Sequence, residues 1–150
     1  MKPKLVNETL NIKTKKVFFL SFILFFFSCE KQNRFPNVYV NISIPVTMPE
    51  FSNLTIPYGY EYINGGLGGI IVLKDIDSGF IAYDRSCTHE QNADCILSGE
   101  STIYDAILKC NNCCQSKFIV IDGSVTEGPA NQALKRYNTY FDGDILYITN

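Results

Sequence analysis

The sequence has little histidine, no tryptophan and no excess of basic charge. Its 150 residues include one His and no Trp, and 13 basic residues stand against 15 acidic ones. A single imidazole excludes the His₃ and His₂Glu sites of zinc enzymes, and it excludes the two-His, one-carboxylate site of iron oxygenases. A net charge of −2 provides no basic face for nucleic acid, so we expect no nucleic-acid partner.

Disorder and fibrous structure are also excluded by the composition. Hydrophobic residues make up 46% of the chain and charged residues 19%, which is close to the average of globular domains. The length allows one domain and hardly two.

The N-terminus is basic and then strongly apolar. Five lysines precede an apolar run over residues 17–27 that is broken only by Ser21. The run is too short to span a bilayer as a helix and has the length of a signal-peptide core. It ends at Ser28-Cys29, which resembles the lipobox of bacterial lipoproteins, where the Cys carries a diacylglycerol. The alternative is a transmembrane or buried segment with an incidental Cys.

The lipoprotein interpretation divides the chain into three parts. We expect a signal peptide over 1–28, a polar tether over 29–37 and a β domain over 38–150. Cys29 is then the lipidation site, and a lipid anchor holds the domain to a membrane without spanning it. The expected location is the bacterial cell envelope, outside the cytoplasm, where disulfides persist.

The remaining sequence predicts strands and turns. No window of 12 residues after Cys29 has a convincing helical period, whereas several short runs are β-branched or alternate between apolar and polar. Gly-rich residues 65–69, Asp122-Gly123 and Asp142-Gly143 predict turns. We therefore predict an all-β fold, a small antiparallel barrel or sandwich. The expected strands cover 38–44, 54–56, 70–73, 80–83, 103–108, 118–121, 134–140 and 145–148.

Cysteines and the only histidine gather in two groups. Cys87 is followed two positions later by His89, and a second group covers residues 110–114. Each group follows a predicted strand, so the two predicted loops can lie at one end of a sheet. Thiolates with an imidazole are ligands typical of iron–sulfur clusters, zinc and copper.

The two groups and their flanks resemble the Rieske iron–sulfur family. That family carries Cys-x-His, a spacer of roughly twenty residues, and then Cys-x-x-His followed by Gly-Ser-x-Phe/Tyr. This chain has Cys87-Thr88-His89, residues 110–114 and then Ser116-Lys117-Phe118. Gly128-Pro129-Ala130 resembles the proline loop that covers the cluster in that family. Over roughly residues 65–150, the resemblance implies a Rieske-like β domain with two cluster-binding loops and a 2Fe-2S cluster.

The second loop departs from the family because it has no His. Two registers follow from the resemblance. Keeping the Cys-x-x-X spacing gives Cys87, His89, Cys110 and Cys113 as ligands. Aligning Ser116 and Phe118 gives Cys114 in place of Cys113.

The second register is preferred because it accounts for all five thiols. Cys113 then matches the extra Cys of respiratory Rieske proteins, which implies a disulfide with Cys95. The resemblance further implies that Ser116 hydrogen-bonds a cluster sulfur and that Pro129 lies in the covering loop.

The implied function is a membrane-anchored, Rieske-like 2Fe-2S protein. It would act as a single-electron carrier or redox subunit with a separate redox protein as its partner, and not as a complete enzyme. The rival hypothesis is a cluster-free, disulfide-stapled structural or interaction lipoprotein with a degenerate Rieske-like fold. A zinc site at Cys87, His89, Cys110 and Cys113 is a third possibility.

Overall fold

The computed structural model describes residues 34–77, 79–99 and 107–150. All of them except Arg34 belong to one compact unit, Phe35–Asn150. The predicted signal peptide, Cys29, the start of the tether and most of the strand predicted at 103–108 lie outside the described residues. Within the described ranges, no helix has both the length and the apolar character needed to cross a membrane.

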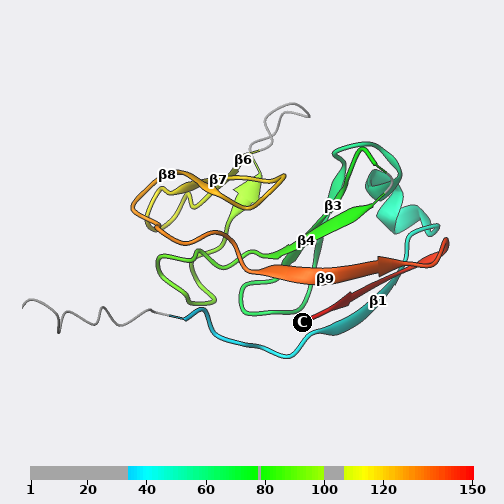
Figure 1. The fold of residues 1–150 in the computed structure, drawn as a ribbon, viewed down its shortest axis with the longest axis horizontal. Coiled ribbons are helices and arrows are strands. Elements are labelled where there is room, and N and C mark those ends of the chain that lie inside the picture. The colour runs from blue at the N-terminus through cyan, green and yellow to red at the C-terminus, as the bar shows by residue number, and fades with distance from the viewer. Residues whose placement is uncertain (1–33, 78, 100–106) are drawn as a thin grey trace, which may run out of the picture. The chain divides into compact units, whose positions relative to one another are not determined.

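Two antiparallel sheets form the unit, so the all-β prediction is confirmed (Figure 1). The larger sheet has six strands in the order β1-β10-β9-β4-β3-β2, and the smaller has four in the order β5-β6-β7-β8. The larger contains β1 (Asn41–Pro45), β2 (Tyr60–Ile63), β3 (Ile70–Lys74), β4 (Phe80–Asp84), β9 (Arg136–Phe141) and β10 (Ile145–Thr149). The smaller contains β5 (Ser98–Gly99), β6 (Ile107–Lys109), β7 (Lys117–Ile119) and β8 (Val125–Glu127).

Strands β3 and β4 are buried on both faces, which explains their continuous apolar sequence. Ile71 and Tyr83 belong to a core that also contains Leu108 and Phe118 of the small sheet. Alternate residues of the same two strands point to a second core, which Leu146 and Ile148 of β10 complete. Adjacent side chains of a strand point to opposite faces, so this pair of strands joins the two cores.

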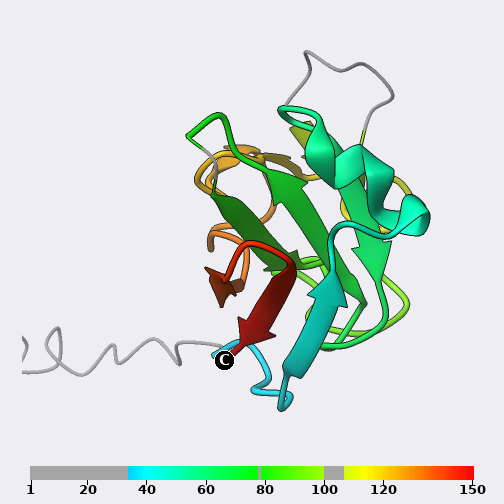
Figure 2. The same ribbon diagram turned by 90° about the vertical axis from the view of Figure 1, so that its right-hand side faces the viewer.

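At one edge of the larger sheet, the first strand of the compact unit pairs with the last. β1 pairs antiparallel with β10, with Ile44 opposite Leu146, and Figure 2 shows β1 beside the C-terminal strand. The hairpin predicted through Asp142-Gly143 is present, since β9 and β10 pair directly.

Four elements differ from the predicted strands. Residues Pro49–Thr55 form a 3-10 helix, so the strand predicted at 54–56 was wrong; Pro49 suits the first turn of a helix because it has no N–H to leave unpaired. Strands β2, β5 and β8 were not predicted. Each has four residues or fewer, too few for a clear alternation to show.

Candidate metal centre

The two cysteine groups lie on two neighbouring loops. A first loop, residues 85–97, follows β4, and a second loop, residues 110–116, connects β6 to β7. The Cys87 N–H donates to the Cys95 carbonyl at 2.8 Å, and the Cys110 N–H donates to the Ser116 carbonyl at 3.0 Å. Each loop is therefore closed on itself by its own backbone.

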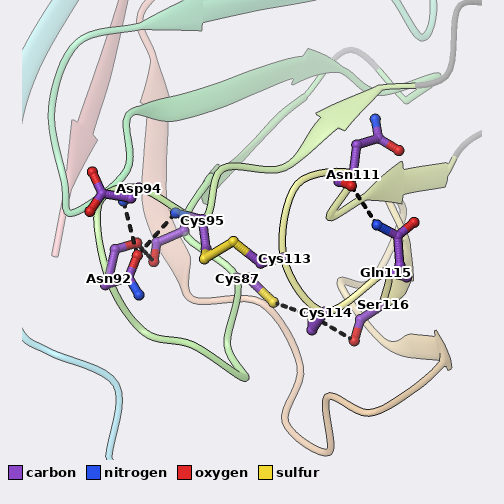
Figure 3. Close-up of a disulfide and its surroundings, with 10 residues drawn as sticks. Cys87, Asn92, Asp94, Cys95, Asn111, Cys113, Cys114, Gln115 and Ser116 are labelled. Atoms are coloured by element: carbon purple, nitrogen blue, oxygen red, sulfur yellow. Dashed lines mark hydrogen bonds between the residues drawn. A yellow bond between two sulfur atoms is a disulfide. The ribbon is translucent and has the colours of Figure 1, made fainter.

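A disulfide between Cys95 and Cys113 joins the two loops (Figure 3). Its Cα atoms are 5.8 Å apart, inside the usual range for disulfides. This pairing is the one implied by the resemblance to respiratory Rieske proteins, so that prediction is confirmed.

The other three thiols of the two loops come together beside the disulfide. The sulfurs of Cys87, Cys110 and Cys114 all lie within 4.8 Å of one another. Cys87 Sγ is 3.0 Å from Cys114 Sγ. Cys87 and Cys110 are fully buried, whereas Cys114 is partly exposed. We call these residues the three-thiol group.

Two residues expected at the site lie outside this group. His89 is exposed and is not among the residues whose ligand atoms come together, so its role as a ligand stays a prediction. Pro129 is also exposed. Its neighbour Ala130 is buried and makes the contact with the second loop.

Ser116 connects the three-thiol group to the segment that contains Pro129. The Cys114 thiol donates to Ser116 Oγ at 3.0 Å, and the Ala130 N–H donates to the same oxygen at 2.9 Å. The Thr88 hydroxyl donates to the Gln132 carbonyl at 2.7 Å. This segment is thus tied to both loops, and Thr88 is a supporting residue that no sequence motif indicated.

The pKa values of the two contacting thiols are shifted in opposite directions. Burial raises the pKa of the Cys87 thiol to about 12. Burial would also raise the pKa of Cys114, but hydrogen bonds with Ser116 and Cys87 outweigh it and lower that pKa below its ordinary value. A cationic metal ion would favour both thiolates, because a coordinating thiol is deprotonated.

Asp84, the last residue of β4, holds the start of the first loop. No sequence motif indicated this role. Its fully buried carboxylate accepts hydrogen bonds from the backbone N–H groups of Leu67, Gly68 and Ser86. It also accepts the Tyr137 hydroxyl at 2.7 Å. The Gly-rich turn packs closely there: a Cβ on Gly68 would lie 2.7 Å from the Ser86 nitrogen. Asp84 therefore fixes the backbone immediately before Cys87.

Gln115 supports the register that places Cys114 where the family has its second His. In that register Gln115 stands at the family's Gly, and its φ is 60°. This is the left-handed region, which glycine occupies without steric cost. The backbone thus keeps the turn that a glycine would make, with Cys114 just before it.

Comparison with solved structures identifies the fold. No protein-family model matches the chain, and no curated protein does. The cyanobacterial plasma membrane Rieske protein PetC3 from Synechocystis PCC 6803 is 22% identical, with a TM-score of 0.52 over 74% of this chain and 99% of that one. The ferredoxin of carbazole 1,9a-dioxygenase from Nocardioides aromaticivorans IC177 is 16% identical, with a TM-score of 0.48 over 75% and 98%. The chain therefore has the Rieske-like fold that its two cysteine loops predicted.

Proposed function

We propose that this protein carries single electrons through a 2Fe-2S cluster held by the three-thiol group. The observation that supports the proposal is the convergence of Cys87, Cys110 and Cys114 from two loops to within 4.8 Å. Among the thiols of these loops, the disulfide takes the two that face elsewhere. The loops thus offer three soft donors at one place.

The donor chemistry fits an iron–sulfur cluster with an altered ligand set. Rieske clusters use two thiolates and two imidazoles, but this chain has a single His. The three thiols supply three ligands, and His89, two residues after Cys87, is the candidate for the fourth. Such a cluster, when bound, accepts and donates one electron.

The chain's own residues would set the environment of the cluster. Buried Cys87 and Cys110 keep water from one side, and Ser116 can direct its hydroxyl at the Cys114 sulfur. Hydrogen bonds to ligand sulfurs tune the potential of iron–sulfur centres. Exposed His89 would lie toward solvent, where an electron could enter or leave.

The proposal includes a membrane anchor. The basic start, the apolar run over 17–27 and Ser28-Cys29 support cleavage before Cys29 and its lipidation. The domain would then lie in the bacterial cell envelope, outside the cytoplasm. Its partner would be a separate redox protein at the same membrane, because a carrier must receive and deliver its electron.

Iron and acid-labile sulfide analysis with electron paramagnetic resonance tests the proposal. Protein purified from its host should contain iron and sulfide in equal amounts, two of each per chain. The Cys114→Ser variant should lose or strongly disturb the centre. Absence of iron and sulfide from the unmodified protein would overturn the proposal.

Two observations favour a second function. His89 lies apart from the three-thiol group, and the disulfide already joins the loops without metal. A cluster-free protein stabilised by this disulfide would act as a structural or interaction module. It would be colourless and iron-free, with three titratable thiols.

A further inference from the structure

Two thiols of the three-thiol group are already in contact. Cys87 Sγ lies 3.0 Å from Cys114 Sγ, and bonded sulfurs are about 2 Å apart, so an approach of about 1 Å would allow a bond. Cys113, the residue before Cys114, is bonded to Cys95 in the first loop. The two loops are therefore held side by side before this pair reacts.

We propose that Cys87 and Cys114 form an exchange-active dithiol that reduces a disulfide substrate. When this pair is oxidised, the three-thiol group can no longer bind a metal ion. The first part is independent of the proposed function. The second part describes the regulation of that same site and concerns the metal-free chain.

Exposure assigns different roles to the two sulfurs. Cys114 is partly exposed, whereas Cys87 and Cys110 are fully buried. Of the three residues, Cys114 is therefore the most accessible to an incoming disulfide. Cys87 is then the resolving thiol, because its sulfur already touches that of Cys114.

The exchange is balanced in two steps. The Cys114 sulfur loses its proton to solvent and attacks one sulfur of the substrate disulfide, whose S–S bond breaks and releases one thiolate. Cys87 then loses its proton and attacks the Cys114 sulfur of this mixed disulfide, which releases the second substrate thiolate. The substrate disulfide gains two electrons, and the Cys87–Cys114 disulfide forms.

Oxidation of this pair would remove the metal site. Soft metals bind thiolates, and a disulfide leaves Cys110 as the only thiolate of the three-thiol group. In an oxidising compartment the pair would thus decide whether the group can hold metal.

A chromogenic disulfide, dithiobis(nitrobenzoic acid), tests the exchange on the metal-free full chain under native conditions. Cys29 is replaced by Ser throughout, because its thiol would otherwise release a further equivalent. The chain with no other change should release two equivalents of nitrobenzoate thiolate and keep no adduct. Peptide mapping should then find Cys87 linked to Cys114 and Cys110 free. The Cys87→Ser variant should release one equivalent and retain the adduct on Cys114.

Two results would overturn the exchange. One is a chain with Cys87 intact that keeps the adduct on Cys114, and the other is a linked peptide that joins Cys110 to Cys114. If Cys87→Ser fails to fold, the mapping of the chain with Cys87 intact still decides the question.

Binding of cadmium ion tests whether oxidation of the pair prevents metal binding, and it needs no iron–sulfur cluster. The reduced chain should show the ultraviolet absorption of cadmium–thiolate bonds, and the oxidised chain should lose it until the pair is reduced again. Equal absorption in both forms would overturn the second part of the proposal. Failure of the electron-carrier proposal would show separately, as an absence of iron and sulfide from the purified protein.

Discussion

The cysteines of the second loop illustrate how one residue position changes a role. Cys113 and Cys114 are adjacent, yet the first is in a disulfide and the second lies with two free thiols. Both residues lie in the turn over residues 111–114. In that turn Cys113 meets Cys95 of the first loop, whereas the Cys114 sulfur lies against that of Cys87.

Removing the disulfide should cost stability and leave the three-thiol group in place. Replacing Cys95 and Cys113 together by Ala should lower the free energy of unfolding by about 3 kcal/mol, because a cross-link over 18 residues restricts the unfolded chain. Denaturant unfolding measures the change. Iron content should stay at the level of the unmodified protein, and its complete loss would contradict the separate roles assigned to the two pairs.

The buried carboxylate of Asp84 should make Tyr137 important for stability. Tyr137→Phe removes the hydroxyl that donates to this carboxylate at 2.7 Å and leaves the three backbone donors. A hydrogen bond to a charged group contributes about 1.5–3 kcal/mol, and the unfolding free energy should fall by that amount. If the unfolding free energy, measured by heat or denaturant, stays nearly unchanged, the three backbone N–H groups alone are enough to stabilise the buried carboxylate.

At the scale of elements, sequence patterns predicted all the long strands and missed three short ones, β2, β5 and β8. The apolar runs at 70–73 and 80–83 were sufficient to predict β3 and β4, because these strands are buried on both faces and so have a continuous apolar sequence. The 3-10 helix over Pro49–Thr55 was missed because its single buried residue, Leu54, gives no period. Short β5 and β8 exist through their partners β6 and β7, which no local pattern can reveal.

The β9–β10 hairpin should weaken at acid pH. The Asp142 carboxylate accepts the backbone N–H groups of Ile145 and Asp144, and these hydrogen bonds lower the pKa of Asp142. Since folding lowers this pKa, the stabilisation is present above the unfolded-state pKa and is lost as pH falls through the folded-state pKa.

Titration of the Asp142 carboxyl carbon by nuclear magnetic resonance checks this prediction. Its midpoint should lie below the ordinary value of 3.8. The Asp142→Asn variant should lose this contribution to acid sensitivity. A midpoint at or above 3.8 would mean that the turn does not hold the carboxylate in solution.

At the scale of the whole molecule, the sequence indicated the three cysteines that come together, and it did not indicate the residues that support their loops. Ordered cysteine motifs indicated the two loops, and the family resemblance implied the Rieske-like fold and the Cys95–Cys113 pair. Asp84 and Thr88 were missed because most of their partners are far away in sequence. His89 is exposed and lies outside the three-thiol group, so its role as a ligand stays a prediction.

The anchor proposal concerns the part of the chain before the compact unit. Cys29→Ala should leave an unprocessed precursor without lipid, because the modified sulfur is absent. Metabolic labelling with a fatty acid, together with the mass of the protein in the membrane fraction, measures both effects. A variant that is cleaved and acylated normally would contradict the lipoprotein interpretation.

A redox titration monitored by electron paramagnetic resonance tests the central claim, a 2Fe-2S cluster with three thiolate ligands, most directly. The unmodified protein should give the signal of a reduced cluster. Three thiolates disfavour an added electron, so the midpoint should fall below the Rieske range of about −150 to +300 mV, toward roughly −400 mV. A midpoint inside the Rieske range would contradict the three-thiolate ligand set, and the absence of any signal at all potentials would contradict the cluster itself.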